Sequence, residues 1–240
     1  MTSPSVSARR FDSRYLARFA AARMDWSDEP TAREVLGILD ELLPRTGITR
    51  GDLLELGCGT GTITFPLTER GYRVTGLDIS AVAVAHARRR ARASGAEATF
   101  HVHDITTPMP ALAGRFALVV DSLALHYVTG AAERLRAVRL ARSALAPDGA
   151  MVVMTMCGEP RRIPSGSRFD PRTRCLESGG IAECHYARPA DLVDLFRSAG
   201  LRPCHTTLVE GCATTGDQDM YLAILRPAGG RPGAAKGDGT

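Results

Sequence analysis

Four acidic side chains follow apolar segments of similar length, and they are the first candidates for chemistry in this chain. They are Glu55, Asp78, Asp104 and Asp121. A carboxylate at a strand end can accept hydrogen bonds from the hydroxyls of a ribose or from an exocyclic amine, and each such bond contributes ~1.5–3 kcal/mol. No lysine or arginine clamp accompanies these acids. The pattern favours a positively charged ligand with a ribose and a donor-rich base, and disfavours one with phosphates.

Three closely spaced glycines follow the first of these segments, in the stretch LLELGCGTGT at residues 53–62. Gly57, Gly59 and Gly61 let the backbone turn sharply and approach a ligand closely, although a plain tight turn needs the same residues. The dinucleotide fingerprint is G-x-G-x-x-G, whereas residue 62 is threonine, and the lysine of a phosphate-binding loop is missing. Together with the acids, the loop predicts S-adenosylmethionine as the cofactor. Taken singly, Asp78 and Asp104 would also suit helix caps.

Strands and helices alternate along the chain and must position these residues. Strands are expected at 52–57, 73–78, 98–104, 116–124, 150–156, 201–209 and 219–226, and helices at 7–19, 29–47, 62–71, 80–95, 131–149 and 188–200. The helix at 29–47 has Thr31 as a possible N-cap and Pro44 near its end. This alternation predicts an α/β fold with a doubly wound, mostly parallel seven-stranded sheet, whose ligands bind beyond the carboxyl ends of the strands.

The length of 240 residues and the ordinary apolar and charged fractions of 44% and 23% predict one domain, from about 9 to 226. Residues 1–8 and 227–240 are expected to be disordered, and the irregular stretch at about 157–187 is expected to form a flap after the fifth strand.

The net charge of +4 is mild. Its excess arginines are interpreted as solvated helix faces, so no nucleic-acid partner is expected. No membrane-length apolar run or secretory signal occurs, so we expect a cytoplasmic protein with reduced cysteines, monomeric or homodimeric.

Five motifs in order resemble the class I S-adenosylmethionine-dependent methyltransferases, in particular the small-molecule group called type 11 or 25. They are LLELGCGTG, VTGLDIS, FHVHDITTPMP, FALVVDSLALHYV and ALAPDGAMVVM, and the resemblance spans about residues 30–226. It implies a Rossmann-like methyltransferase fold. It also implies that the cofactor is held by Glu55, Gly57, Cys58, Gly59, Gly61, Asp78, Ile79, Asp104, Ile105, Asp121 and Ser122. Within this set Cys58 is expected to pack rather than react.

Methyl transfer is a displacement at carbon, so the enzyme mainly aligns the acceptor and removes its proton. His126 lies just past the fourth strand, where the family places groups near the methyl, and it is the candidate general base. It would otherwise bond a loop or pack over the cofactor. Tyr127 is expected to be a pocket wall.

Two further segments are expected to enclose a small-molecule substrate. The flap contributes Arg174, His185 and Tyr186, and the segment before the first core helix contributes Tyr15, Phe19 and Trp26, although aromatic residues of this kind also serve ordinary packing. Two adjacent Cys-His pairs, at 184–185 and 204–205, lack the spacing of structural zinc ligands, so no metal is expected.

The primary hypothesis is methyl transfer to an oxygen or nitrogen of a small molecule, with specialised metabolism as the suggested context. A second hypothesis keeps the cofactor but replaces methylation with an intramolecular cyclisation that releases methylthioadenosine. A third is a non-catalytic module that binds the cofactor.

Overall fold

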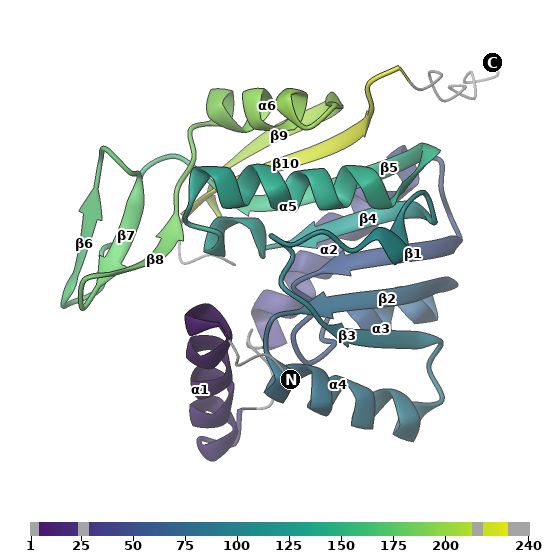
Figure 1. Cartoon of the computed structure of the whole chain (residues 1–240), viewed down its shortest axis with the longest axis horizontal. Helices are drawn as coiled ribbons and strands as arrows, with labels where there is room; N and C mark the ends of the chain where they lie inside the picture. Colours follow the sequence, from purple (N-terminus) through teal and green to yellow (C-terminus); the bar gives the residue numbers. More distant parts are fainter. Residues whose placement is uncertain (1–4, 24–28, 213–217, 230–240) are drawn as a thin grey trace.

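The computed structural model describes residues 5–23, 29–212 and 218–229, and its centre is a seven-stranded sheet (Figure 1). The strand order is β3-β2-β1-β4-β5-β10-β9. These strands are β1 (Gly51–Leu56), β2 (Tyr72–Asp78), β3 (Ala98–Val102), β4 (Phe116–Ser122), β5 (Leu145–Met156), β9 (Leu201–Cys212) and β10 (Gln218–Pro227). The strands β1 to β5 pair in parallel, and β10 runs antiparallel to both β5 and β9. The predicted doubly wound, mostly parallel seven-stranded sheet is therefore confirmed.

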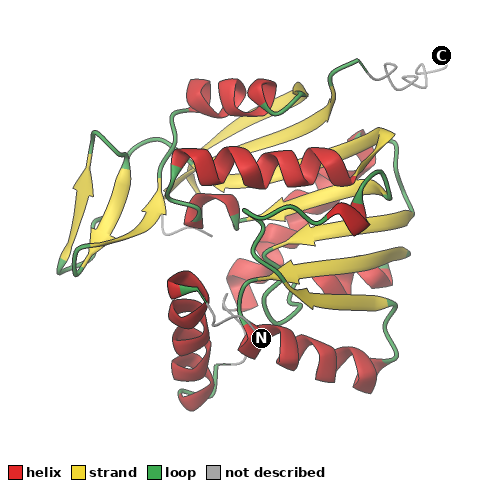
Figure 2. Cartoon of the chain, in the orientation of Figure 1, coloured by secondary structure: helices red, strands yellow, loops and turns green. Residues whose placement is uncertain are grey.

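Helices cover both faces of the sheet (Figure 2). They are α2 (Glu29–Arg45), α3 (Thr64–Glu69), α4 (Ala81–Ser94), α5 (Ala131–Ala144) and α6 (Pro189–Ser198), with short turns η1 (Pro110–Leu112) and η2 (Leu125–Tyr127). A further helix, α1 (Val6–Ala20), lies to one side of the sheet (Figure 1). Two apolar clusters lie on opposite faces of the sheet. Because successive side chains of a strand point to opposite faces, Leu54 packs with the cluster of α5 and α6, and its neighbour Leu53 packs with the cluster of α2.

The carboxyl ends of β1 to β4 meet at one edge, and the strand order reverses between β1 and β4. In an open α/β sheet this edge is where ligands bind. In Figure 1 the arrowheads of β1 to β3 point toward the side occupied by α1 and by a second, smaller sheet.

The smaller sheet follows β5 and consists of three antiparallel strands, β6 (Ser167–Asp170), β7 (Cys175–Ser178) and β8 (Ile181–His185). Gly179 and Gly180 join β7 to β8 with positive φ angles of 56° and 76°, which glycine adopts without strain. The segment expected to be a flap thus contains a small antiparallel sheet with a glycine turn. Its action as a cap over a substrate stays a prediction.

Several local boundaries differ from those read in the sequence. α1 begins at Val6, inside the segment expected to be disordered, because the Ser5 hydroxyl accepts a hydrogen bond from Ala8 N and caps the helix. α2 begins at Glu29, so Thr31 lies within the helix and is not its N-cap, and the helix continues past Pro44. β5 begins at Leu145 because that residue already pairs with β4 through an irregular register.

Candidate functional site

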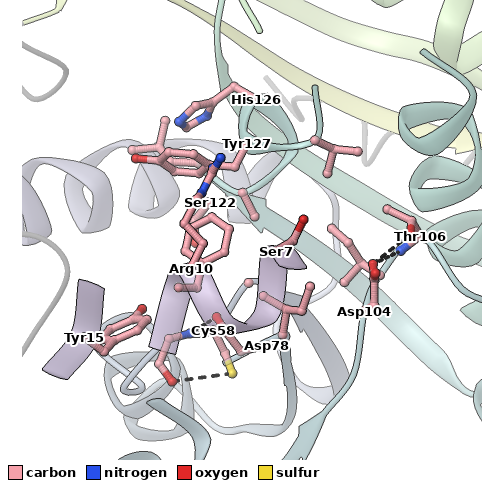
Figure 3. A pocket seen from close by; sticks show the side chains of 18 of the residues that line it. Ser7, Arg10, Tyr15, Cys58, Asp78, Asp104, Thr106, Ser122, His126 and Tyr127 are labelled. Atoms are coloured by element: carbon pink, nitrogen blue, oxygen red, sulfur yellow. Dashed lines mark hydrogen bonds between the residues drawn. The ribbon is translucent and has the colours of Figure 1, made fainter. Parts of the chain in front are cut away.

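A cavity of about 1150 Å³ lies at the carboxyl edge of the sheet, between the strand ends and α1 (Figure 3). Most of its lining comes from α1, from the glycine-rich loop after β1, and from the segments that follow β2, β3 and β4. The predicted residues that line it are Tyr15, Glu55, Gly57, Cys58, Gly59, Asp78, Ile79, Asp104, Ile105, Ser122, His126 and Tyr127. The sheet topology therefore gathers residues from most of the first half of the chain around one space.

Each of the three glycines after β1 is required at its position for a different structural reason. Gly57 has a φ of 67°, and an added Cβ there would lie 2.4 Å from the Cβ of Ala124. At Gly59, with a φ of 53°, an added Cβ would lie 2.6 Å from the Tyr15 hydroxyl. Gly61 does not line the cavity, because its φ of 90° turns the chain away and sets it against the Phe65 ring. The loop is thus a cradle closed from above by α1, and only its first two glycines face the cavity.

Cys58 both packs and lines the cavity. Its sulfur lies against Gly76 of β2, where an added Cβ would approach within 2.7 Å, and it belongs to a small apolar cluster with Phe100. Burial raises the pKa of its thiol well above the ordinary value. The thiol therefore stays protonated, in agreement with the packing role expected from the sequence.

Asp78 joins the ends of β1 and β2. One carboxylate oxygen accepts from Gly59 N at 2.8 Å, and the other accepts from Ser80 N at 2.8 Å. Burial raises the pKa of Asp78 to about 6, and the two backbone donors oppose this shift. The carboxylate is held rigidly at the cavity wall, and a positive ligand would favour its charged form.

Glu55 lies deeper and is almost completely buried at the end of β1. The pKa of Glu55 is raised to about 8, and burial is the largest cause. The nearby charge of Asp78 also raises this pKa, whereas hydrogen bonds donated by the hydroxyls of Thr64 and Ser122 lower it. No lysine or arginine of the described residues pairs with Glu55 or Asp78. No ion pair with the described part of the protein neutralises these two acids, which suits a cationic ligand.

A third acid, Asp104, lies to one side in Figure 3. One of its carboxylate oxygens accepts from both Thr106 N and the Thr106 hydroxyl, at 2.9 and 2.8 Å. Ile79 and Ile105 line the same cavity. An acid flanked by apolar side chains suits a flat base with an exocyclic amine.

Asp121 does not line the cavity, contrary to the prediction. It is fully buried, and one oxygen turns back to accept from Ala124 N and Leu125 N at 3.1 and 3.0 Å. Burial raises its pKa to about 7. Asp121 therefore shapes the loop after β4, and only its neighbour Ser122 reaches the cavity.

His126 lies at the opposite end of the cavity from Asp78 in the view of Figure 3. Its side chain is 2% exposed, and neither ring nitrogen has a hydrogen-bond partner among the described residues. The ring packs against Tyr127 with centroids 4.2 Å apart. Burial alone lowers the pKa of His126 to about 3, so the imidazole is neutral at neutral pH. A buried imidazole that lines a cavity, with neither nitrogen bonded to the described protein, can bond to a ligand or to water.

The helix α1 forms one wall of the cavity. Asp12 accepts from the Ser80 hydroxyl at 2.6 Å and from Val82 N at 3.1 Å, which fastens α1 to the first turn of α4. On the other side Arg14 pairs with Glu183 of β8, so α1 also contacts the smaller sheet. α1 is therefore held at two places while it covers the cradle.

Of the two described residues that were predicted as substrate contacts in the N-terminal segment, Tyr15 and Phe19, only Tyr15 lines the cavity. Tyr15 lines it, and burial raises the pKa of this phenol well above its ordinary value. Phe19 does not line it, because its ring packs on His86 of α4 at 5.2 Å. Trp26 lies outside the described residues.

The three residues predicted from the flap do not line the cavity. Arg174 is engaged by the backbone oxygens of Tyr186 and Gly158. His185 is buried in the smaller sheet, where burial lowers its pKa to about 4, and Tyr186 packs edge-on against Phe169. Arg174 thereby ties the smaller sheet to the segment after β5. Ile181 and Ala182 line the cavity in place of the three predicted side chains.

Sequence reasoning also missed Arg10 and Phe11, which line the cavity from α1. The arginines of this helix were interpreted as a solvated face, which is wrong for Arg10 and Arg14. A signal was present, because Arg10, Arg14 and Arg18 recur every four residues and therefore share one helical face.

No group of three or more His, Cys, Asp or Glu side chains in the described part of the chain is arranged to hold a metal ion. The six cysteines are not joined to one another. Within the same residues, no helix has the length and apolar character needed to cross a bilayer.

Known proteins resemble this chain in sequence and in fold. A family model described as a methyltransferase domain matches residues 53–149, from β1 into β5. The ubiquinone biosynthesis O-methyltransferase of Cereibacter sphaeroides is 31% identical over 185 residues, which cover 75% of this chain and 71% of that protein.

Two solved structures share the fold. The 1,6-didemethyltoxoflavin-N1-methyltransferase of Burkholderia thailandensis, with bound 1,6-didemethyltoxoflavin and S-adenosylhomocysteine, has a TM-score of 0.69 at 19% identity, over 95% of this chain and 91% of that chain. The magnesium protoporphyrin IX methyltransferase of Synechocystis, with bound S-adenosylmethionine, has a TM-score of 0.64 at 17% identity, over 92% of this chain and 95% of that chain.

Proposed function

The chain belongs to the class I S-adenosylmethionine-dependent methyltransferases, and we propose that it transfers the methyl group to a hydroxyl oxygen of a small molecule. The observation that carries this proposal is His126, a buried neutral imidazole with two unsatisfied nitrogens in the cavity that also contains the acids. A hydroxyl bound there would satisfy one nitrogen and place its oxygen inside the same enclosed space.

The acidic end of the cavity fits the cofactor. Asp78 would accept from the ribose hydroxyls, and Asp104 from the adenine amine, with Ile79 and Ile105 packed on the base. Gly57 and Gly59 let Ala124 and Tyr15 pack closely on the loop that lines this end of the cavity, and a Cβ at either position would prevent this. Glu55 and Asp78 are carboxyl groups without a basic partner, and their ionised forms complement a sulfonium compound.

When bound, S-adenosylmethionine supplies a methyl group activated by a positive sulfur. The acceptor oxygen donates an electron pair to form the new carbon–oxygen bond, and the electrons of the old carbon–sulfur bond remain on the sulfur. The oxygen–hydrogen bond of the acceptor breaks, and its proton passes to a nitrogen of His126 and then to solvent. Alignment of the acceptor with the methyl group in the cavity would contribute up to ~7–11 kcal/mol.

The low pKa of His126 restricts the acceptor. An imidazole with a pKa of about 3 is a good hydrogen-bond acceptor but a weak base. It assists an acidic hydroxyl, such as a phenol with an ordinary pKa of ~10, much better than an aliphatic alcohol. An acidic hydroxyl is therefore the acceptor that this site supports best. The relative at 31% identity, which is named as an O-methyltransferase, also favours oxygen over nitrogen.

The test is a methyl-transfer assay with labelled S-adenosylmethionine and a panel of phenols, alcohols and amines, followed by mass spectrometry of the products. We expect methyl ethers of phenols together with S-adenosylhomocysteine. Products methylated only on nitrogen would overturn oxygen as the acceptor atom. Methylthioadenosine formed without an acceptor would instead indicate intramolecular cyclisation.

The role of His126 is tested by His126→Gln. We expect kcat/KM for a phenol to fall by ~10²–10⁴-fold, while the Kd of S-adenosylhomocysteine stays within about twofold. His101→Gln is the matched control, because His101 lies on β3 and does not line the cavity. Equal kcat/KM for His126→Gln and the wild type would remove His126 from the proposed mechanism.

A further inference from the structure

A second unsatisfied group lies in the part of the cavity lined by His126. Arg10 lines the cavity from α1, and its Nε is buried without a hydrogen-bond partner among the described residues. The other nitrogens of this guanidinium are engaged or close to a partner. Nη1 donates to Ala182 O at 3.0 Å, and Nη2 lies 3.8 Å from a carboxylate oxygen of Glu183. The guanidinium is thus held at its end, while its buried Nε–H has no hydrogen-bond partner among the described residues.

Ring contacts connect Arg10 to His126. The Arg10 guanidinium carbon lies 5.3 Å from the centre of the Phe11 ring, and Phe11 meets Tyr127 edge-on at 5.7 Å. Tyr127 in turn packs on His126. In the view of Figure 3, Arg10 lies between Asp78 and the pair formed by His126 and Tyr127. Two aromatic rings therefore form a wall that carries an unsatisfied donor and an unsatisfied imidazole.

The charge near this wall is positive. Arg10 and Arg14 share the single carboxylate of Glu183, which leaves one guanidinium charge in excess. Such an excess stabilises negative charge on a bound ligand, in contrast to the acidic end of the cavity. The two ends of one cavity are thus suited to ligands of opposite charge.

We propose that the acceptor is a planar aromatic compound that carries, besides the reacting hydroxyl, a second oxygen that accepts a hydrogen bond from Arg10 Nε. This inference rests on the proposed O-methylation and names the substrate class of the same site. The ring of the acceptor packs against Phe11 and Tyr127, the reacting hydroxyl binds His126, and the second oxygen binds Arg10. Where the second oxygen belongs to a carbonyl group, that group also withdraws electrons from the ring and makes the hydroxyl more acidic, which matches the weak basicity of His126.

The experiment compares compounds with and without the second oxygen. The 2-, 3- and 4-hydroxyacetophenones place a carbonyl at three distances from the hydroxyl, and the three ethylphenols are their matched partners without it. Each is titrated by calorimetry into the full chain saturated with S-adenosylhomocysteine. We expect at least one hydroxyacetophenone to bind about 10- to 100-fold more tightly than its ethylphenol.

Three variants test whether Arg10 Nε causes the tighter binding of a hydroxyacetophenone relative to its ethylphenol. In Arg10→Met we expect that advantage to fall to about twofold or less. Arg9→Met, which changes an exposed neighbour outside the cavity, should keep the advantage. Glu183→Gln removes the carboxylate that holds α1 but leaves Arg10 Nε in place, so it should also keep the advantage. If Glu183→Gln abolishes it as fully as Arg10→Met, the fastening of α1 is responsible and the assignment to Arg10 Nε is wrong.

The remaining outcomes are also decisive. If all three hydroxyacetophenones bind no better than the ethylphenols in the wild type, or if none of the six binds, the inference is overturned. A methyl-transfer assay on the same compounds tests the proposed function separately. Methylation of ethylphenols without any carbonyl advantage would support O-methylation and refute the role of Arg10. A carbonyl advantage in binding without methyl transfer would support acceptor recognition and count against O-methylation.

Discussion

Cofactor binding should release a proton from Glu55, and this makes the affinity for S-adenosylmethionine depend on pH. In the free protein, burial holds the pKa of Glu55 at about 8, so at pH 7 its carboxyl group is roughly 90% protonated. The cofactor brings a sulfonium charge into the cavity that Glu55 lines. Opposite charge favours the ionised carboxylate, so the pKa of Glu55 falls in the complex and the proton leaves.

The magnitude follows from proton linkage. If the complex contains only ionised Glu55, the association constant rises by up to tenfold per pH unit below pH 8 and levels off above it. Between pH 6 and pH 8 the rise from Glu55 is at most about 50-fold. Asp78, with a pKa of about 6 in the free protein, adds about a factor of two over the same interval.

The assay is isothermal titration calorimetry of S-adenosylmethionine at pH 6, 7 and 8. At pH 7 it is repeated in buffers of different ionisation enthalpy, which measures the number of protons released. We expect about one proton at pH 7. Glu55→Gln should release almost none and keep only the small dependence from Asp78. Glu133→Gln is the control, because Glu133 also lines the cavity but Arg136 lowers its pKa, so it is charged throughout this interval.

The same group affects the stability of the free protein with a definite sign. The folded-state pKa of Glu55 is raised, so its contribution to stability is complete below the ordinary pKa of 4.5 and is lost as pH rises through about 8. The ligand-free wild type should therefore melt at a lower temperature at pH 9 than at pH 7, and Glu55→Gln should reduce that difference. A cofactor affinity that is constant from pH 6 to pH 8, or a slope unchanged in Glu55→Gln, would refute this account.

Three further substitutions test the site. Asp78→Asn should weaken S-adenosylhomocysteine binding by about 10- to 100-fold in calorimetry, because it removes the charge of an acceptor for the ribose hydroxyls; an unchanged Kd would exclude Asp78 from the cofactor site. Gly57→Ala should destabilise the protein by about 2–4 kcal/mol in chemical denaturation, because its methyl group would meet Ala124, whereas Gly71→Ala has open space and should cost about 1 kcal/mol; equal losses would contradict the packing argument. Asp12→Ala should loosen α1 from α4, so limited proteolysis should cleave α1 several-fold faster, and an unchanged rate would show that this contact does not hold the helix.

The sequence alone determined the fold and the acidic half of the site. Strands and helices that alternate at this spacing can form little else than a parallel sheet, and parallel strands bring their carboxyl ends to one edge. Residues at those ends therefore come together whatever the details of packing. For this reason Glu55, Asp78 and Asp104 could be assigned to one cavity from their positions in the chain.

Only the tertiary structure decided the acceptor half. Asp121 occupies the same kind of strand-end position as Asp78, yet it turns inward because the backbone of the following loop offers it two donors. Arg174 binds the backbone of Tyr186 and Gly158, and His185 is buried in the smaller sheet, so neither lines the cavity. Arg10 was taken for a solvent-exposed arginine, but it lines the cavity because α1 is bonded to the start of α4 and to β8. These orientations depend on contacts between segments up to 172 residues apart. A local pattern carries no record of such contacts, because they depend on how separate elements pack against one another.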